Sequence, residues 1–264
     1  MTVETLGGLL VVTATVIVAS VVLLWLVSLR LRNASIIDLF WGFGFVVIAW
    51  VAWLVLTSGG GSRRRLLLVL ATAWGLRLAG YLTWRNTGKG EDFRYRAMRE
   101  RWGPRFPLVS LVTVFLLQAV LMLVVSLPVQ AGMLTGGAVG IAGVIGVVLW
   151  AAGVVFETTG DLQLARFKRD PANRDKVMDR GLWRYTRHPN YFGDAVFWWG
   201  LGLVACAVPG GVFALASPAL MTALLLRVSG VTLLERSLSR SKPGWDDYAA
   251  RTSAFFPWRP KRKD

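Results

Sequence analysis

The sequence has few of the residues on which several large enzyme classes depend. Its 264 residues include one cysteine and one histidine. A single cysteine permits no disulfide within the chain. One histidine without a second histidine or cysteine beside it argues against a zinc or iron site, so we expect no metal. The chain also lacks a G-x-G-x-x-G segment after a strand, a P-loop and a nucleophile elbow, which excludes the usual nucleotide folds and serine hydrolases.

Apolar residues, in contrast, are abundant and arranged in long runs. Hydrophobic residues make up 55% of the chain, and its mean hydropathy is +0.52. A run of about 20 apolar residues is long enough to cross the hydrocarbon core of a bilayer. We therefore expect an all-α integral membrane protein of about seven transmembrane helices in one bundle, with residues 1–264 forming a single domain. The predicted spans are 6–29, 36–56, 65–84, 107–130, 138–160, 191–209 and 212–234.

Acidic residues are half as common as basic ones, and the basic residues are unevenly distributed. The net charge is +15, and 25 of the 30 Lys and Arg lie at 30–32, 85–105, 166–187 and from 236 onward. With the N-terminus outside, all four segments lie on the cytoplasmic side, as does the C-terminus, in agreement with the positive-inside rule. The three arginines at 63–65 are the exception. Membrane orientation explains most of the basic excess, so no nucleic-acid partner is expected, and anionic membrane lipids are.

Several charged residues interrupt the apolar runs. Ionisable groups within membrane helices are costly and mark binding sites or ion pairs. Glu157, Asp161 and Lys168 follow one another at helical spacing, and Asn190 and Asp194 lie one turn apart. We expect a polar cavity near the cytoplasmic ends of the helices, with an apolar region deeper in. The charged residues concerned are Asp38, Arg77, Glu157, Asp161, Asp194, Arg227 and Glu235.

The residues around the single histidine carry a family resemblance. RHPNYFGD at 187–194 resembles the motif of membrane reductases that act on steroid and sterol double bonds, and FETTGDLQLARFKRDP at 156–171 is similar to their helix-to-loop segment. The tail PGWDDYAARTSAFFPWRP resembles their C-terminal ending, and SIIDLFWGFGF resembles the uncharacterised bacterial branch of the steroid 5-alpha-reductase group. The likeness is concentrated in 156–260. The RHPxYxG part alone also occurs in isoprenylcysteine and phospholipid methyltransferases.

This resemblance implies a bundle that holds NADPH in its cytoplasmic half, about residues 156–260, and takes a lipid-like substrate from the bilayer. It also implies hydride transfer to a C=C bond of that substrate, as in 3-oxo-5-alpha-steroid 4-dehydrogenases, in a multi-pass protein of a bacterial inner membrane. Lys168 and the arginines would neutralise phosphates, and His188 would donate a hydrogen bond. The positions that match cofactor-contacting residues are Asp161, Lys168, Tyr185, Arg187, His188, Asn190, Tyr191, Asp194 and Arg227.

The sequence departs from the family pattern at the catalytic positions. Steroid 5-alpha-reductases have a Gln-Glu pair early in the second helix and a tyrosine in the third. This chain has Asp38 near the first position and Trp74 near the second, and Tyr81 is the nearest phenol on the same face. We expect Asp38 and Tyr81 to form the catalytic donor pair, because a negative charge that develops on the substrate oxygen needs a hydrogen-bond donor. The departure puts a steroid substrate in question, but not the cofactor.

Two other functions are compatible with the same residues. A membrane methyltransferase that uses S-adenosylmethionine would share the RHPxYxG segment but would need fewer phosphate ligands. A non-catalytic lipid-binding membrane protein would use the same charges only to hold its helices together. Lys168 and Asp161 favour the reductase.

Overall fold

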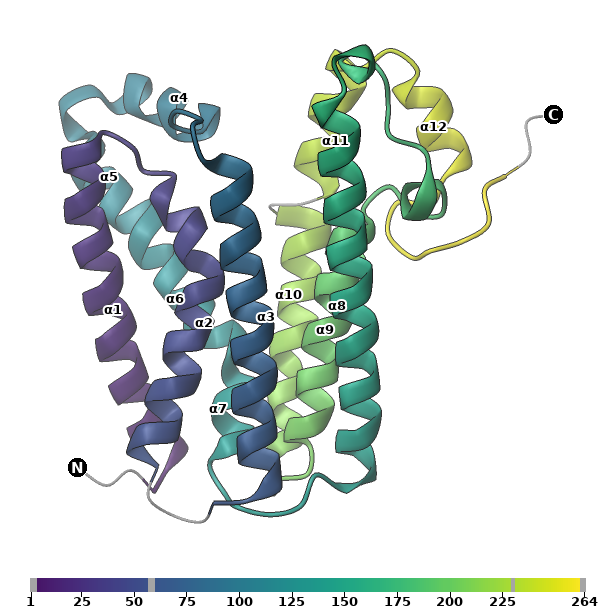
Figure 1. Cartoon of the computed structure of the whole chain (residues 1–264). Coiled ribbons are helices and arrows are strands. Elements are labelled where there is room, and N and C mark those ends of the chain that lie inside the picture. Colours follow the sequence, from purple (N-terminus) through teal and green to yellow (C-terminus); the bar gives the residue numbers. More distant parts are fainter. Residues whose placement is uncertain (1–3, 57–59, 229–230, 262–264) are drawn as a thin grey trace. The chain divides into compact units, whose positions relative to one another are not determined.

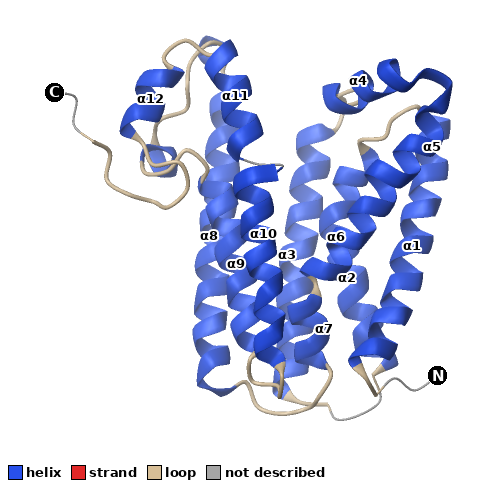
Figure 2. Ribbon diagram, turned by 180° about the vertical axis from the view of Figure 1, so that it is seen from behind, coloured by secondary structure: helices blue, strands red, loops and turns tan. Residues whose placement is uncertain are grey.

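All regular structure that we observe is helical. A computed structural model describes residues 4–56, 60–228 and 231–261. Every regular element in these ranges is a helix, and Figure 2 contains no strand. The prediction of an all-α protein is confirmed. Positions 229 and 230 of the seventh predicted span, and Arg262 and Lys263 of the basic tail, lie outside the described residues.

The described helices form two compact units. Unit 1 comprises Met1–Gly140 and Val204–Ala214, and unit 2 comprises Ile141–Leu203 and Leu215–Asp264. Whether they act as a single domain stays a prediction. The helices of unit 1 are α1 (Leu6–Leu31), α2 (Ile36–Val55), α3 (Ser62–Asn86), α4 (Phe93–Trp102), α5 (Phe106–Ser110), α6 (Leu117–Val125) and α7 (Leu127–Met133). The helices of unit 2 are α8 (Gly140–Arg169), α9 (Pro189–Ala205), α10 (Ala216–Ala223), α11 (Val231–Ser241) and α12 (Trp245–Arg251).

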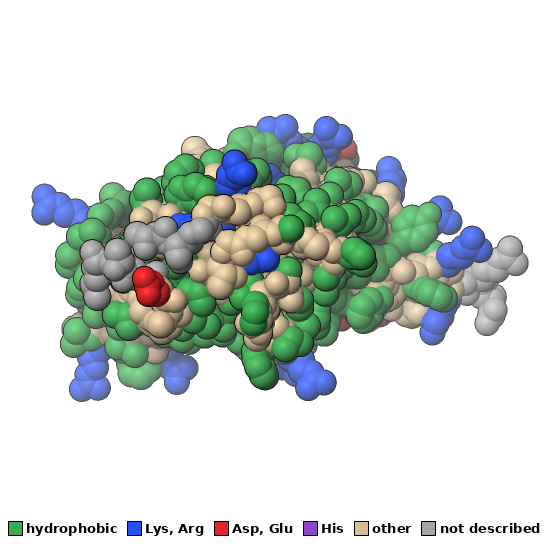
Figure 3. Space-filling model, turned by 90° about the horizontal axis from the view of Figure 1, so that it is seen from below, with side chains coloured by type: hydrophobic (Ala, Val, Ile, Leu, Met, Phe, Trp, Pro, Cys, Tyr) green, Lys and Arg blue, Asp and Glu red, His purple; other side chains and the backbone are tan. Residues whose placement is uncertain are grey.

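Five described helical segments are long and apolar enough to cross a membrane. A sixth apolar segment, Gly211–Arg227, is shorter, and α9 is 17 residues long. These helices support a multi-pass membrane protein, whereas the number seven and the orientation of the termini stay predictions. Hydrophobic side chains are also the commonest kind on the face seen in Figure 3, where acidic ones are rare. The five segments are Leu6–Leu31, Ile36–Val55, Ser62–Asn86, Phe93–Val125 and Gly140–Arg169.

In unit 1, α2 packs against α1 on one side and α3 on the other. The α2–α3 contact is close because two glycines face each other: a methyl group on Gly42 would lie 2.5 Å from the carbonyl oxygen of Gly75. Small residues allow helix backbones to approach this closely. In a membrane, where the hydrophobic effect does not drive helices together, such close packing stabilises their association. The rings of Phe45 and Trp74, with centroids 5.6 Å apart, fill the space beside this contact.

Arg63 and Arg64, the first two arginines of α3, are buried. The guanidinium of Arg63 donates to the carbonyl oxygens of Gly132, Thr135 and Gly136, and that of Arg64 donates to carbonyls of Trp53 and Leu56. Both arginines therefore satisfy carbonyl groups at helix C-termini, where the helix dipole favours a positive charge. Their role as internal caps accounts for two of the three arginines that depart from the charge asymmetry, whereas Arg65 is exposed.

In unit 2, α8 and α9 approach each other along a row of glycines. A methyl group on Gly153 would lie 2.5 Å from the backbone nitrogen of Phe197, and one on Gly193 would lie 2.4 Å from that of Glu157. One on Gly200 would lie 2.6 Å from the carbonyl oxygen of Gly146. This contact fixes the start of α9, and with it the motif around His188, against the second half of α8.

Candidate functional site

The segment between α8 and α9 folds back onto α8. The backbone nitrogen of Leu182 donates to Oε1 of Gln163 (2.9 Å), and the indole nitrogen of Trp183 donates to the carbonyl oxygen of Gly160 (3.0 Å). Short 3₁₀ turns at Pro171–Asn173 and Gly181–Arg184 give the segment its shape. These contacts place the basic residues of 166–187 at the end of α8.

The C-terminal segment lies beside the histidine motif. The backbone nitrogen of Arg187 donates to the carbonyl oxygen of Ser253 (2.9 Å), and that of Trp258 donates to the carbonyl oxygen of Tyr185 (2.9 Å). The buried hydroxyl of Thr186 donates to the carbonyl oxygen of Phe255 (2.8 Å). The two most distinctive stretches of the sequence, the RHPNYFGD motif and the aromatic tail, therefore form one structure within unit 2.

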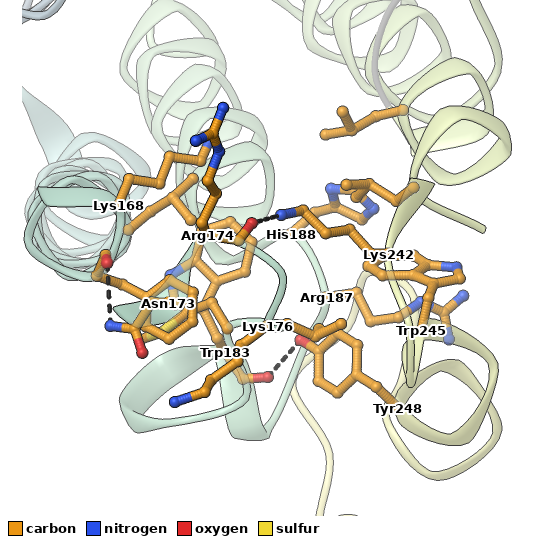
Figure 4. Close-up of a pocket in the computed structure, with 16 residues that line it drawn as sticks. Lys168, Asn173, Arg174, Lys176, Trp183, Arg187, His188, Lys242, Trp245 and Tyr248 are labelled. Carbon is orange, nitrogen blue, oxygen red and sulfur yellow. Dashed lines mark hydrogen bonds between the residues drawn. The ribbon is translucent and has the colours of Figure 1, made fainter. Parts of the chain in front are cut away.

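A cavity of about 390 Å³ opens between these segments of unit 2. Figure 4 shows Lys168, Asn173 and Arg174 on one side of it and Trp245 and Tyr248 on the other. Apolar side chains form much of its wall. None of the described residues that line the cavity is acidic, whereas the basic ones are Lys168, Arg174, Lys176, Arg187 and Lys242.

The aromatic wall of the cavity is held by its own hydrogen bonds. The buried hydroxyl of Tyr248 donates to the carbonyl oxygen of Trp183 (2.6 Å), which joins α12 to the loop before α9. Burial raises the pKa of the Tyr248 phenol, so the hydroxyl keeps its proton and remains a donor. The ammonium of Lys242 donates to the carbonyl oxygen of Arg174 and so joins the end of α11 to the same loop. The cavity is thus a pocket with aromatic walls and a basic lining.

Arg187, His188 and Glu235 form a cluster at one wall of the pocket. Arg187 donates from Nε and Nη2 to the two carboxylate oxygens of Glu235 (2.8 and 3.0 Å), and from Nη1 to the carbonyls of Ala249 and Thr252 (2.7 and 2.6 Å). Nε2 of His188 lies 3.0 Å from Oε1 of Glu235. Burial alone would raise the pKa of Glu235, but the hydrogen bonds from His188 and Arg187 outweigh it and hold the pKa at about 2. Glu235 is therefore an anion, and Nε, Nη1 and Nη2 of Arg187 all donate to groups of the protein itself.

Two of the predicted cofactor residues bond to each other. Nδ2 of Asn190, at the start of α9, donates to Oδ1 of the buried Asp161 on α8 (3.2 Å). Tyr191 stacks on His188, with ring centroids 5.4 Å apart and an interplanar angle of 3°. These three residues hold the start of α9 and the imidazole in place.

The remaining predicted cofactor residues are more widely spread. Lys168 and His188 line the pocket together with Arg187. Tyr185 is exposed and lies in a separate hollow with Trp258 and Arg259. Asp194 is half-buried on α9, and Arg227 is exposed in the π-helical segment Leu224–Val228. Their contacts with a cofactor stay predictions.

Asp38, the predicted catalytic acid, lies in unit 1 and bonds to α4. Its Oδ1 accepts from the hydroxyl of Tyr95 (2.7 Å), and its Oδ2 accepts from Nη2 of Arg94 (3.1 Å). Helix α4 lies across the end of unit 1 at which α1 ends and α2 begins (Figure 1). The ring of Tyr81 lies 5.9 Å from that of Trp84. The pairing of Asp38 with Tyr81 stays a prediction, and Tyr95 is the phenol that the structure joins to Asp38.

Sequence reasoning missed several residues of the pocket. Arg174 and Lys176 lie in the basic loop that it singled out, and Trp245 and Tyr248 lie in the tail segment PGWDDY. The signal available was the density of basic and aromatic residues in these two segments. Their convergence on one cavity depends on how the loop and tail fold, which no local pattern encodes. In the described ranges, no three His, Cys, Asp or Glu side chains come together as a group that could hold a metal ion.

Comparison with known proteins agrees with these features. Over 70 residues, the chain is 34% identical to the Mus musculus and Rattus norvegicus proteins named 3-oxo-5-alpha-steroid 4-dehydrogenase 1, which confirms the resemblance to steroid 5-alpha-reductases. That match covers 26% of this chain, and the chain covers only 28% and 27% of the length of these curated relatives. No solved structure matches. A family described as "Protein of unknown function (DUF1295)" matches residues 24–252, most of the chain, and the protein therefore belongs to this DUF1295 family.

Proposed function

We propose that this protein is an NADPH-dependent membrane oxidoreductase that reduces a C=C bond of a lipid-like or steroid-like substrate. The observation that carries the proposal is the pocket in unit 2, whose lining is basic and aromatic and contains no acidic residue among those described. The names of the mouse and rat relatives support the same class of reaction.

The charges of the pocket fit the charges of NADPH. This cofactor carries a diphosphate and a 2′-phosphate, and lysine and arginine are the usual ligands of such groups. Arg187 is neutralised by Glu235, and we propose the other basic lining residues, Lys168, Arg174, Lys176 and Lys242, as the phosphate ligands. The indoles of Trp183 and Trp245 give the pocket flat apolar faces on which a planar ring can stack.

When bound, the cofactor would supply a hydride from its nicotinamide ring. The protein's contribution would be to neutralise the phosphates and to hold the ligand by hydrogen bonds from named groups. Asp38, in its protonated form, and Tyr81 remain our proposed donors to the substrate oxygen, with Tyr95 as a second phenol bonded to Asp38. A donor at that oxygen stabilises the negative charge that develops when a polarised C=C bond accepts hydride.

The pocket is less suited to S-adenosylmethionine, because that cofactor carries a positive sulfonium and no phosphate. A lining of lysines and arginines repels the sulfonium, and an acidic residue that could offset the repulsion is not found among the described lining residues. No feature of the described residues favours the methyltransferase over the reductase.

We also propose seven spans, with the N-terminus outside and the C-terminus cytoplasmic, in a bacterial inner membrane. The basic segments support this orientation. Two of the three arginines that conflict with this orientation, Arg63 and Arg64, are buried inside the protein. Membrane lipids and a lipid-like substrate are the partners that such an arrangement predicts.

The test is a melting experiment on the detergent-purified full chain with NADPH, NADH or S-adenosylmethionine. A ligand that binds only the folded state raises the melting temperature. At 100 times its Kd it adds about 2.7 kcal/mol to the free energy of unfolding. We expect a rise with NADPH and none with S-adenosylmethionine. A rise with S-adenosylmethionine alone would reassign the protein to the methyltransferases, and no rise with any of the three would favour a non-catalytic lipid binder. Where NADPH binds, its oxidation in the presence of enone lipids tests the reaction.

A further inference from the structure

Glu235 holds two neighbouring residues with one carboxylate. It comes from α11, and it accepts from Nε and Nη2 of Arg187 and lies 3.0 Å from Nε2 of His188. Its side chain is 22% exposed, and that of His188 is 1% exposed. The imidazole is thus enclosed, with its Nε2 directed at a carboxylate.

The charge of Glu235 decides which ring nitrogen of His188 carries the proton. An ionised carboxylate has only acceptor sites, so the hydrogen in the His188–Glu235 contact must come from Nε2. In a neutral imidazole one nitrogen is protonated and the other has a lone pair. Nδ1 of the neutral ring is therefore an acceptor.

Nδ1 of His188 is buried and has no hydrogen-bond partner among the described residues. A buried polar atom of this kind is costly unless something bonds to it. The ring lines the pocket, and the stacked ring of Tyr191 fixes its plane. Because the ring lines the pocket, a ligand bound there is the partner that we consider for this nitrogen.

We propose that Glu235 is a positioning residue that fixes His188 as its Nε2–H tautomer, so that Nδ1 accepts a hydrogen bond from a hydroxyl or amide N–H of the bound ligand. The identity of that ligand rests on the proposed function. In NADPH the ribose hydroxyls and the carboxamide are such donors, whereas the phosphates at neutral pH are acceptors. The phosphates then lie at the lysines, and a donor end of the ligand lies at His188. This assigns His188 the role of acceptor instead of the donor role that the sequence suggested.

The competing state of His188 is an imidazolium with N–H donors on both nitrogens. Glu235 contacts the ring, and the basic residues Arg187 and Lys242 line the same pocket. The phenol of Tyr248 also lines the pocket and carries no charge. The tautomer and the imidazolium differ at Nδ1, so a direct measurement separates them.

The chain offers an unusually simple measurement, because His188 is its one histidine. The full chain, purified with a histidine-free tag and labelled with ¹⁵N-histidine, gives a single pair of ring nitrogen signals. Without ligand we expect a protonated Nε2 and an unprotonated Nδ1 at pH 7.5. A proton on Nδ1, in either the other tautomer or the imidazolium, would overturn the proposal.

Two variants test whether Glu235 sets this state. Glu235→Gln keeps the shape but can also donate to the ring, so we expect a mixture of tautomers and NADPH affinity lowered about tenfold. An unchanged Nε2–H tautomer in this variant would remove Glu235 from the positioning role. Asp179→Asn, which breaks an exposed ion pair with Arg251, is the matched control and should leave the His188 signals unchanged. Circular dichroism establishes that each variant is folded.

Addition of NADPH separates this proposal from the proposed function. If NADPH raises the melting temperature and shifts the Nδ1 signal in the direction of an accepted hydrogen bond, both are supported. If NADPH binds and Nδ1 does not shift, the acceptor role is wrong although the cofactor is right. If NADPH does not bind, the proposed function fails, and the ligand-free tautomer still decides the role of Glu235.

Discussion

Arg187 and Glu235 form a bidentate ion pair, in which Nε donates to Oε1 at 2.8 Å and Nη2 donates to Oε2 at 3.0 Å. The remaining nitrogen of Arg187 donates to the carbonyls of Ala249 and Thr252 at the end of α12. One guanidinium thereby joins the residue before His188 to two helices that bound the pocket. Arg187 thus helps to build the wall of the pocket.

Arg187→Lys is predicted to destabilise the protein. A lysine ammonium cannot reproduce the bidentate geometry of the planar guanidinium. It therefore leaves one oxygen of Glu235 and two carbonyls without their donor. Loss of partly buried charge-assisted hydrogen bonds of this kind costs about 2–4 kcal/mol. Thermal unfolding in detergent measures the effect. Arg184→Lys, at an exposed position nearby, is the control, and equal melting temperatures for the two variants would contradict a structural role for Arg187.

The Glu235 cluster predicts a pH dependence of stability. The pKa of this carboxyl in the folded protein is about 2, below the ordinary value of 4.5. A lowered pKa contributes stability that is fully present above the unfolded pKa and is lost as pH falls through the folded one. The wild type should therefore lose its stability advantage over Glu235→Gln between about pH 4.5 and pH 2. If wild type and Glu235→Gln differ in melting temperature by the same amount across this range, the Glu235 carboxylate does not cause the pH dependence of stability.

The glycine contact of α8 and α9 predicts a steric effect. Gly153→Ala would put a methyl group 2.5 Å from the backbone nitrogen of Phe197, so the helices must separate. Overpacking of this kind costs about 1–3 kcal/mol. Gly80→Ala, also in a helix but with open space around it, should be neutral or slightly stabilising because alanine favours a helix. Equal unfolding temperatures for the two variants would refute the close contact.

Tyr95 and Tyr81 make different predictions for the chemistry. Tyr95→Phe removes the 2.7 Å hydrogen bond to Asp38 and should cost about 1–2 kcal/mol of stability. Tyr81→Phe should lower the turnover rate if Tyr81 donates to the substrate, with little effect on NADPH affinity. Turnover and NADPH binding of both variants distinguish these roles. If Tyr81→Phe keeps the full rate and Tyr95→Phe loses it, Tyr95 replaces Tyr81 as the donor.

The sequence predicted the parts of the structure that depend on local periodicity and on short motifs. Long apolar runs predicted helices because a helix satisfies its backbone hydrogen bonds within the segment that crosses the membrane. The sequence did not predict that Glu235 bonds to Arg187, 48 positions earlier, or that Asp38 bonds to Tyr95, 57 positions later. Both pairs are set by how loops and short helices pack, which leaves no periodic signal along the chain.

We propose that the basic pocket of unit 2 binds NADPH, and a titration of NADPH into two charge variants tests this binding most directly. Lys176→Gln and Lys242→Gln each remove one lining charge, and Lys89→Gln removes an exposed charge in the loop between α3 and α4. A charge-assisted contact with phosphate is worth about 1.5–3 kcal/mol, so each pocket variant should bind NADPH at least about tenfold more weakly. Wild-type affinity is expected for Lys89→Gln. Wild-type affinity in both pocket variants would contradict the assignment of this pocket to the cofactor.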